Sequence, residues 1–170
     1  MRTVSRWSLL TLCLLLVACG FHLRQPAHLP AAMQRTYIAD AGGNAELVRA
    51  LRRSLVTPTT SVTDDATTAT AVLNILNTQR FQRVLAVSNT GQPLEYQVAY
   101  EVRFSLTAAG GKTLIAPQKL TLTREYAYNV ANVIGDTEQA NVLYKALEDN
   151  MAQLIMFRLE AAGRQMQGGR

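Results

Sequence analysis

The chain has 170 residues, of which 48% are hydrophobic and 17% charged, and its net charge is +5 at neutral pH. That length suits one ordinary domain with a hydrophobic core of its own. The basic residues form no long lysine or arginine cluster, so a nucleic-acid-binding protein is not expected.

The N-terminus has the pattern of a bacterial export signal. Arg2 and Arg6 precede an apolar stretch at residues 9–17, which has about half the ~20 residues needed to span a bilayer. We predict that residues 1–18 are removed as a signal peptide. The remaining 152 residues would carry 15 basic and 12 acidic side chains, a net charge of +3, because the signal contains two arginines and no acids.

Residues 16–19, Leu-Val-Ala-Cys, resemble a lipobox, in which a large aliphatic residue, a tolerant position and a small residue precede a cysteine. The resemblance implies cleavage after Ala18, an S-diacylglycerol group on Cys19 and an N-acyl chain such as palmitate on the new amine. More than one acyl chain gives stable anchoring. Gly20 stands where an aspartate would suggest retention at the inner membrane, so the resemblance points to the outer membrane. The alternative is that Cys19 is an ordinary buried thiol in an uncleaved segment.

Four further segments follow from composition. Residues 19–35, with two prolines and both histidines, are expected to be an extended lipidated leader. Residues 36–162 form the predicted single domain, and residues 163–170 a flexible tail. The threonine-rich stretch 57–70 is expected to be an exposed connection with one short strand near 61–63.

The first half of the domain predicts a strand and then an amphipathic helix. Residues 36–39 form a short strand candidate that ends at Asp-Ala-Gly-Gly. Asn44 is placed to cap a helix in which leucines recur every four residues from Leu47, and which ends before Pro58.

Three longer strands are expected next. Residues 71–88 form the first, with a bend at Gln79-Arg80, after which three apolar residues share a parity. Residues 94–107 alternate strictly between apolar and polar side chains, which predicts a half-buried antiparallel strand. Turns at 89–93 and 109–112 flank it, and a hairpin partner follows. The three apolar residues after the bend are Phe81, Leu85 and Val87.

The last element is a helix with an apolar stripe at three- and four-residue spacing. We expect Asp136 to cap it, with Gln139 completing a capping box, and the helix to end near Ala162. Together the elements predict an α+β fold with two amphipathic helices packed on one face of a mostly antiparallel four-stranded sheet.

The sequence offers no set of residues for catalysis. Both histidines, His22 and His28, lie in the leader, and no free thiol remains after processing. We therefore expect no enzyme, no metal and no cofactor. A hydrolase that uses only carboxylates is the remaining enzymatic alternative, with Glu95 and Glu101 as its candidates.

Basic residues near the hairpins are the candidate ligand contacts, because arginine and lysine suit phosphate groups. The alternative is that they are ordinary solubilising charges. The candidates are Arg80, Arg83, Lys112, Lys119 and Arg124.

Two motifs resemble the LptE family of lipopolysaccharide-assembly lipoproteins. Residues 19–24, Cys-Gly-Phe-His-Leu-Arg, resemble the family's mature start, and residues 91–97 resemble its Gly-Gln, Glu-Tyr-Gln strand entry. The resemblance implies a lipoprotein on the periplasmic side of the outer membrane that plugs the lumen of the β-barrel LptD. It also implies that the protein helps the barrel to fold and contacts lipopolysaccharide.

This chain departs from the family at two places. Some members carry a basic residue before the first hairpin turn and another before the last helix, where Asn89 and Gly135 stand here. Arg80 or Arg83 could replace those contacts. The alternative function is a periplasm-facing scaffold or pilot lipoprotein for another outer-membrane complex, with no lipid ligand.

Overall fold

The computed structural model describes residues 29–129 and 133–168 of the chain. The predicted signal peptide, Cys19 and the leader up to residue 28 lie outside the described residues, as do residues 169–170 at the end of the predicted tail.

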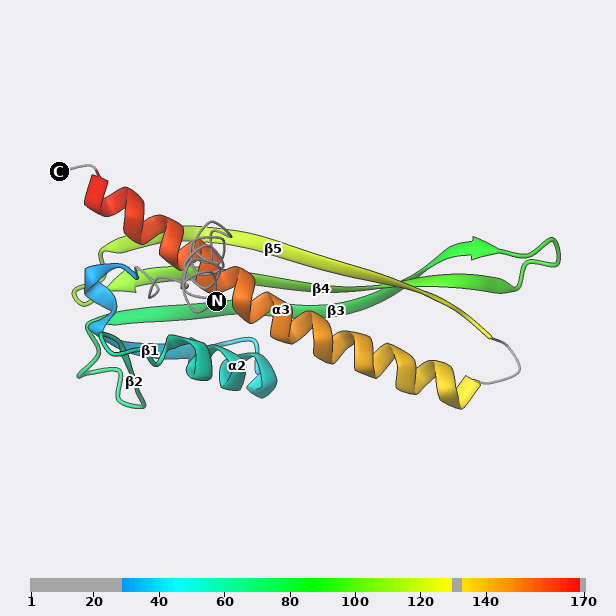
Figure 1. The fold of residues 1–170 in the computed structure, drawn as a ribbon, viewed down its shortest axis with the longest axis horizontal. Helices are drawn as coiled ribbons and strands as arrows, with labels where there is room; N and C mark the ends of the chain where they lie inside the picture. Colours follow the sequence, from blue (N-terminus) through cyan, green and yellow to red (C-terminus); the bar gives the residue numbers. More distant parts are fainter. Residues whose placement is uncertain (1–28, 130–132, 169–170) are drawn as a thin grey trace, which may run out of the picture.

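One mixed sheet with the strand order β2-β1-β3-β4-β5 forms the long body of the molecule (Figure 1). Its strands β3, β4 and β5 are antiparallel, whereas β1 pairs in parallel with both β2 and β3. The strands are β1 (Arg35–Asp40), β2 (Ser61–Thr63), β3 (Ala71–Val87), β4 (Pro93–Ala108) and β5 (Thr113–Ala127).

The α+β class is confirmed, but the predicted four-stranded sheet is wrong in detail, because the sheet has five strands and two parallel pairings. The strand near 61–63 was expected within a connection, and it joins the sheet as an edge. The α-helix α2 (Ala45–Leu55) connects β1 to β2 and brings the chain back in the same direction, which produces the parallel pairing.

Two α-helices cover one face of the sheet, as predicted (Figure 1). Asn44 caps α2, because its side-chain oxygen accepts a hydrogen bond from the Leu47 amide at 3.0 Å. The second helix, α3 (Val133–Gly168), crosses over β4 and β5. Its side chains Leu147, Met151, Ile155 and Leu159 are all buried in the core.

The ends of α3 differ from the prediction. The helix begins at Val133, so Asp136 lies in its first turn and accepts a hydrogen bond from the Asn129 amide at 3.1 Å. A carboxylate is still favourable there because of the positive end of the helix dipole. The helix also continues to Gly168 instead of ending near Ala162. Adding a turn to a helix that is already formed requires no new nucleation, so the last turn can form although most of its side chains are exposed.

The predicted leader contributes to the folded body. Ala31–Gln34 form a 3-10 helix, η1, directly before β1. Met33 within it is fully buried and Leu29 is nearly so. Burial of these two side chains fixes the start of β1 against the core.

The apolar face predicted for β4 is confirmed in its central part, where Val98, Tyr100, Val102, Phe104 and Leu106 are fully buried. The other face is less exposed than predicted, because Gln97, Ala99 and Ser105 are also buried. The hairpin turns are also confirmed: Gly91 lies at φ 78°, and Gly110 and Gly111 lie at φ 84° and 85°. The bend expected at Gln79-Arg80 is wrong, because β3 is instead irregular between Ile75 and Asn77 and again after Val84.

Candidate interaction surface

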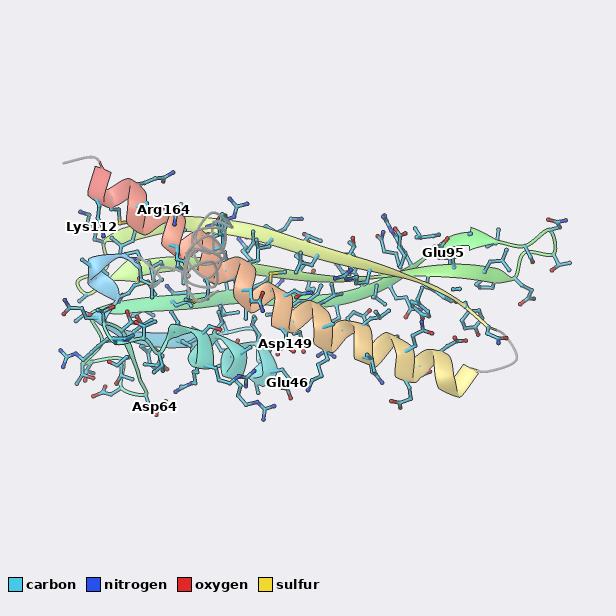
Figure 2. The ribbon with its side chains drawn as sticks, in the orientation of Figure 1. Glu46, Asp64, Glu95, Lys112, Asp149 and Arg164 are labelled. Atoms are coloured by element: carbon cyan, nitrogen blue, oxygen red, sulfur yellow. The ribbon has the colours of Figure 1, made fainter. Side chains whose placement is uncertain are left out.

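The tip of the β3–β4 hairpin extends past β5, which pairs with β4 as far as Glu95, at one end of the molecule (Figure 1). We call residues 81–98 the distal arm. β1 pairs with β3 only as far as Ile75, so the distal part of β3 has a neighbouring strand on one side only. Figure 2 shows Glu95 of the arm and Lys112 of the β4–β5 turn near opposite ends of the body.

The distal arm carries an unusual number of exposed apolar side chains. Phe81 lies on the sheet face that the helices leave open, in register with Ala99, and is 43% exposed. Val87, near the turn, is 58% exposed. Exposed apolar side chains gathered on one hairpin favour an interaction site. The exposed apolar residues of the arm are Phe81, Val84, Leu85, Val87 and Leu94.

In the sequence, the odd-numbered positions of Phe81, Leu85 and Val87 predict that their side chains lie on the same face of the strand. The register shift between Val84 and Ala86 breaks that parity, and all three side chains are exposed. The arm therefore presents apolar groups that no described element covers, which the alternation pattern alone did not reveal.

A tyrosine cluster stiffens the base of the arm on the helix-covered face. The rings of Tyr96 and Tyr126 stack with centroids 5.8 Å apart, and Tyr128 meets Tyr96 edge-on at 5.1 Å. Gln82 donates a hydrogen bond to the Tyr126 hydroxyl at 2.9 Å. Burial, with a smaller contribution from the negative charge of Asp136, raises the pKa of Tyr126, so its hydroxyl stays neutral.

The five candidate cations do not form one cluster. Arg80 and Arg124 are in register with Tyr100 and Val98, whose side chains are buried beneath the helices. Arg83 and Lys119 are in register with Gln97 and Arg103 and lie on the open face. Lys112 lies in the turn at the other end of the body (Figure 2).

Two of these cations already have partners. Lys119 pairs with Glu101 at 3.1 Å on the open face. Arg80 pairs with the nearly fully buried Glu148 of α3 at 2.6 Å, and its guanidinium lies 5.3 Å from the centroid of the Tyr144 ring. Arg83 and Arg124 form no ion pair within the described part of the chain, so they are the cations of the arm region that are available to a ligand.

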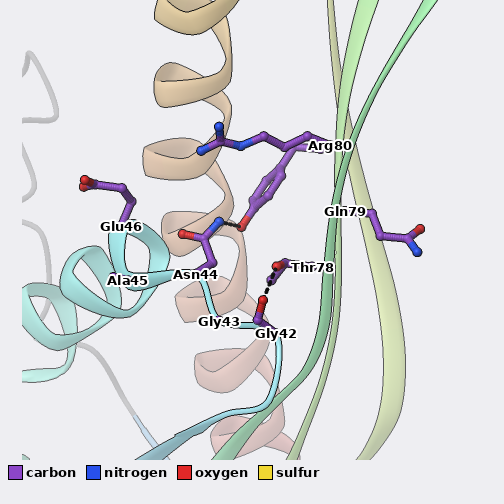
Figure 3. A pocket seen from close by; sticks show the side chains of 9 residues that line it. Gly42, Gly43, Asn44, Ala45, Glu46, Thr78, Gln79 and Arg80 are labelled. Atoms are coloured by element: carbon purple, nitrogen blue, oxygen red, sulfur yellow. Dashed lines mark hydrogen bonds between the residues drawn. The ribbon is translucent and has the colours of Figure 1, made fainter.

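A polar network around Glu148 joins both helices to the sheet. The Asn44 amide donates to Glu148 and to the Tyr100 hydroxyl, both at 2.8 Å. Figure 3 shows Asn44 and Arg80 at an open pocket of about 380 Å³, which Tyr100 also lines. Burial, and then the charge of Glu148, raises the pKa of Tyr100, so its hydroxyl remains protonated.

This pocket is better explained as part of the contact between the helices and the sheet than as a catalytic site. Asn44 and Tyr100 in its lining are hydrogen-bonded to each other, and Thr78 donates to the Gly42 carbonyl. No buried side-chain polar atom in the described residues lacks a partner. Glu101 is engaged by Lys119, while Glu95 lies in the arm, six residues away along the same strand. The described residues hold no group of three or more potential metal ligands. No helix within ranges 29–129 and 133–168 is long and apolar enough to cross a membrane.

Two solved structures of bacterial lipoproteins share this fold. The solution structure of an uncharacterized lipoprotein B from Nitrosomonas europaea matches with a TM-score of 0.68 and 26% identity, covering 84% of this chain and 91% of that one. The crystal structure of the rare lipoprotein B from Shewanella oneidensis matches with a TM-score of 0.68 over 78% of this chain and 98% of that one. Its identity of 20% supports the likeness of fold alone.

A model of the LptE family, described as lipopolysaccharide-assembly, matches residues 33–159, and the chain belongs to this family. It is 28% identical over 147 residues to the LPS-assembly lipoprotein LptE of Pectobacterium atrosepticum, covering 86% of this chain and 79% of that protein. The corresponding protein of Yersinia enterocolitica is 26% identical over 153 residues, with 89% and 73% covered. The predicted family is confirmed, and with it a non-enzymatic lipoprotein of lipopolysaccharide assembly.

Proposed function

We propose that this protein is anchored to the outer membrane through Cys19, sits in the lumen of the β-barrel LptD, assists folding of that barrel and contacts lipopolysaccharide. The observation that carries the proposal is the exposed apolar distal arm at one end of a long body. The proposal is equally based on the membership of this chain in the lipopolysaccharide-assembly family.

The length of the body supports a plug that reaches through a membrane-embedded barrel. The 36 residues of α3 span ~54 Å at ~1.5 Å per residue. The 16 residues of β4 span ~53 Å at ~3.3 Å per residue. A bilayer with its headgroups is ~40–45 Å thick, so a body of this length could place its two ends on opposite sides.

The open face of the sheet also suits a barrel interior, because the lumen of a wide barrel is polar. Besides the Glu101–Lys119 pair, Gln97 donates to Glu125 at 3.0 Å on this face. Of these groups, Lys119 and Glu125 are exposed and can form hydrogen bonds with polar side chains of a lumen.

The distal arm combines the two chemistries that lipopolysaccharide requires. Its exposed apolar side chains suit acyl chains, and the unpaired Arg83 and Arg124 nearby suit phosphates. These two arginines would take the role that Asn89 and Gly135 cannot perform.

Co-purification tests the proposal. We expect the wild-type chain, recovered from detergent-dissolved outer membranes, to carry LptD with it. The double change Leu85→Asp and Val87→Asp should lower the LptD recovered about tenfold, because the exposed apolar side chains of the arm would pack against the barrel as well as against acyl chains. Val56→Asp is the matched control, since Val56 is 64% exposed and lies outside the arm.

Circular dichroism would verify that all variants are folded. Recovery of a different ring or barrel complex in place of LptD would support the scaffold alternative. If both variants recover the same amount of LptD, the distal arm is not part of the interface with LptD.

A further inference from the structure

A second apolar surface lies at the opposite end of the molecule from the distal arm. Here η1, the last turns of α3 and the β4–β5 turn surround a groove of about 480 Å³, which we call the proximal groove. Met166, 38% exposed, leaves part of its apolar surface open to solvent there. The groove is lined chiefly by Pro30, Ala31, Ala32, Lys112, Gly163 and Met166.

We propose that this groove binds a segment of the chain itself, residues 21–23 of the N-terminal leader, which carry the apolar side chains Phe21 and Leu23. The described chain begins at Leu29, whose side chain is buried, and the next two residues form a wall of the groove. The described chain therefore begins beside the groove.

The length of the leader allows this docking. Phe21 is eight residues before Leu29, and that stretch reaches ~26 Å when extended. This is long enough to turn back onto α3. Because the segment is covalently attached, its effective concentration at the groove is in the millimolar range, so even a weak site is filled.

The chemistry of the two surfaces matches. Phe21 and Leu23 are the large apolar side chains of residues 20–28, which otherwise hold mainly small or polar residues. Met166 has a flexible thioether that adapts to an aromatic ring. Lys112 and Gln167 at the rim offer donors for the backbone carbonyls of an extended segment.

The docking has a consequence that rests on the proposed anchor at Cys19. With Phe21 in the groove, a single residue, Gly20, separates the lipidated cysteine from the docked ring. The proximal end of the body would then lie at the membrane surface, and the distal arm would point away from the anchor.

Tryptophan fluorescence tests the docking, because Trp7 is the one tryptophan of the chain and lies in the predicted signal. In the mature lipidated protein, Phe21→Trp should give blue-shifted emission that iodide quenches poorly. Adding Met166→Asp should return the emission to that of an exposed indole. Gln25→Trp, a polar leader position, is the control and should be exposed in both backgrounds.

A disulfide test covers the case in which Met166→Asp disturbs folding. Cysteines at positions 22 and 167, which leave Phe21 and Leu23 in place, should cross-link within one chain, whereas cysteines at 22 and 90, in the distal turn, should not. A blue shift that persists with Met166→Asp, without the 22–167 cross-link, would place Phe21 in the detergent and overturn the proposal. A cross-link between two chains would overturn it in favour of a second copy. Either failure with LptD still recovered would leave the proposed function intact.

Discussion

At the scale of single residues, Glu148 shows how an otherwise apolar interface between helices and sheet accommodates a charge. Its carboxylate is 4% exposed, whereas the Arg80 partner remains 45% exposed. The Asn44 amide supplies a further hydrogen bond. Since a buried charge is tolerated only when it is paired and hydrogen-bonded, the two members of the ion pair are not equivalent.

We therefore predict unequal losses of stability. Arg80→Gln leaves a buried carboxylate without its counter-charge and should lower the free energy of unfolding by about 3 kcal/mol. Glu148→Gln leaves Arg80 free to reach water and keeps an acceptor for Asn44, so its cost should be about 1 kcal/mol. Urea denaturation followed by circular dichroism measures both. Equal losses would contradict the view that burial of Glu148 dominates the pair.

At the scale of elements, sequence periodicity located most helices and strands but could not define their ends or partners. The leucine spacing and the Asn44 cap gave α2 correctly, and strict alternation gave β4. The three residues of β2 are too few to show a period, so their parallel pairing was not foreseen. The irregularities in β3 arise from pairing with β4, a tertiary effect that leaves no local signal.

The candidate site was predictable only in part for the same reason. The charges of Arg83 and Arg124 were visible in the sequence, but the pairing of Arg80 with Glu148 joins residues 68 positions apart. The exposed apolar residues of the arm resembled a core strand. Exposure depends on what covers a strand, and the sequence of the strand does not contain that information.

Substitutions on the two faces of α3 directly test which face of this helix packs against the sheet. Leu159 is fully buried against the sheet, while Phe157, two residues away, is 57% exposed. Leu159→Ala should lower the free energy of unfolding by about 3 kcal/mol, through lost burial and the cavity that remains. Phe157→Ala should change it by less than about 0.5 kcal/mol. Thermal denaturation of the two variants compares them, and a larger loss for Phe157→Ala would mean that α3 packs through a different face.

At the scale of the whole molecule, the two ends have different chemistry. The proximal end holds the start of the described chain, the C-terminal part of α3 and Lys112 (Figures 1 and 2). The distal end holds the exposed apolar arm, with Arg83 on one face and Arg124 on the other. This polarity suits a protein that is anchored near one end and meets its ligand at the other.

Lipopolysaccharide binding should follow that polarity. If phosphates are bound at the distal end, Arg83→Ala and Arg124→Ala should each weaken binding about fivefold, which corresponds to about 1 kcal/mol for a partly screened contact. Lys112→Ala is the matched control, because it removes one exposed positive charge from the opposite end and should leave the affinity unchanged. Titration of each variant with purified lipopolysaccharide at two salt concentrations gives the comparison. A uniform loss for all three variants would show that net charge attracts the ligand without a localised site, and a loss for Lys112→Ala alone would move the site to the proximal end.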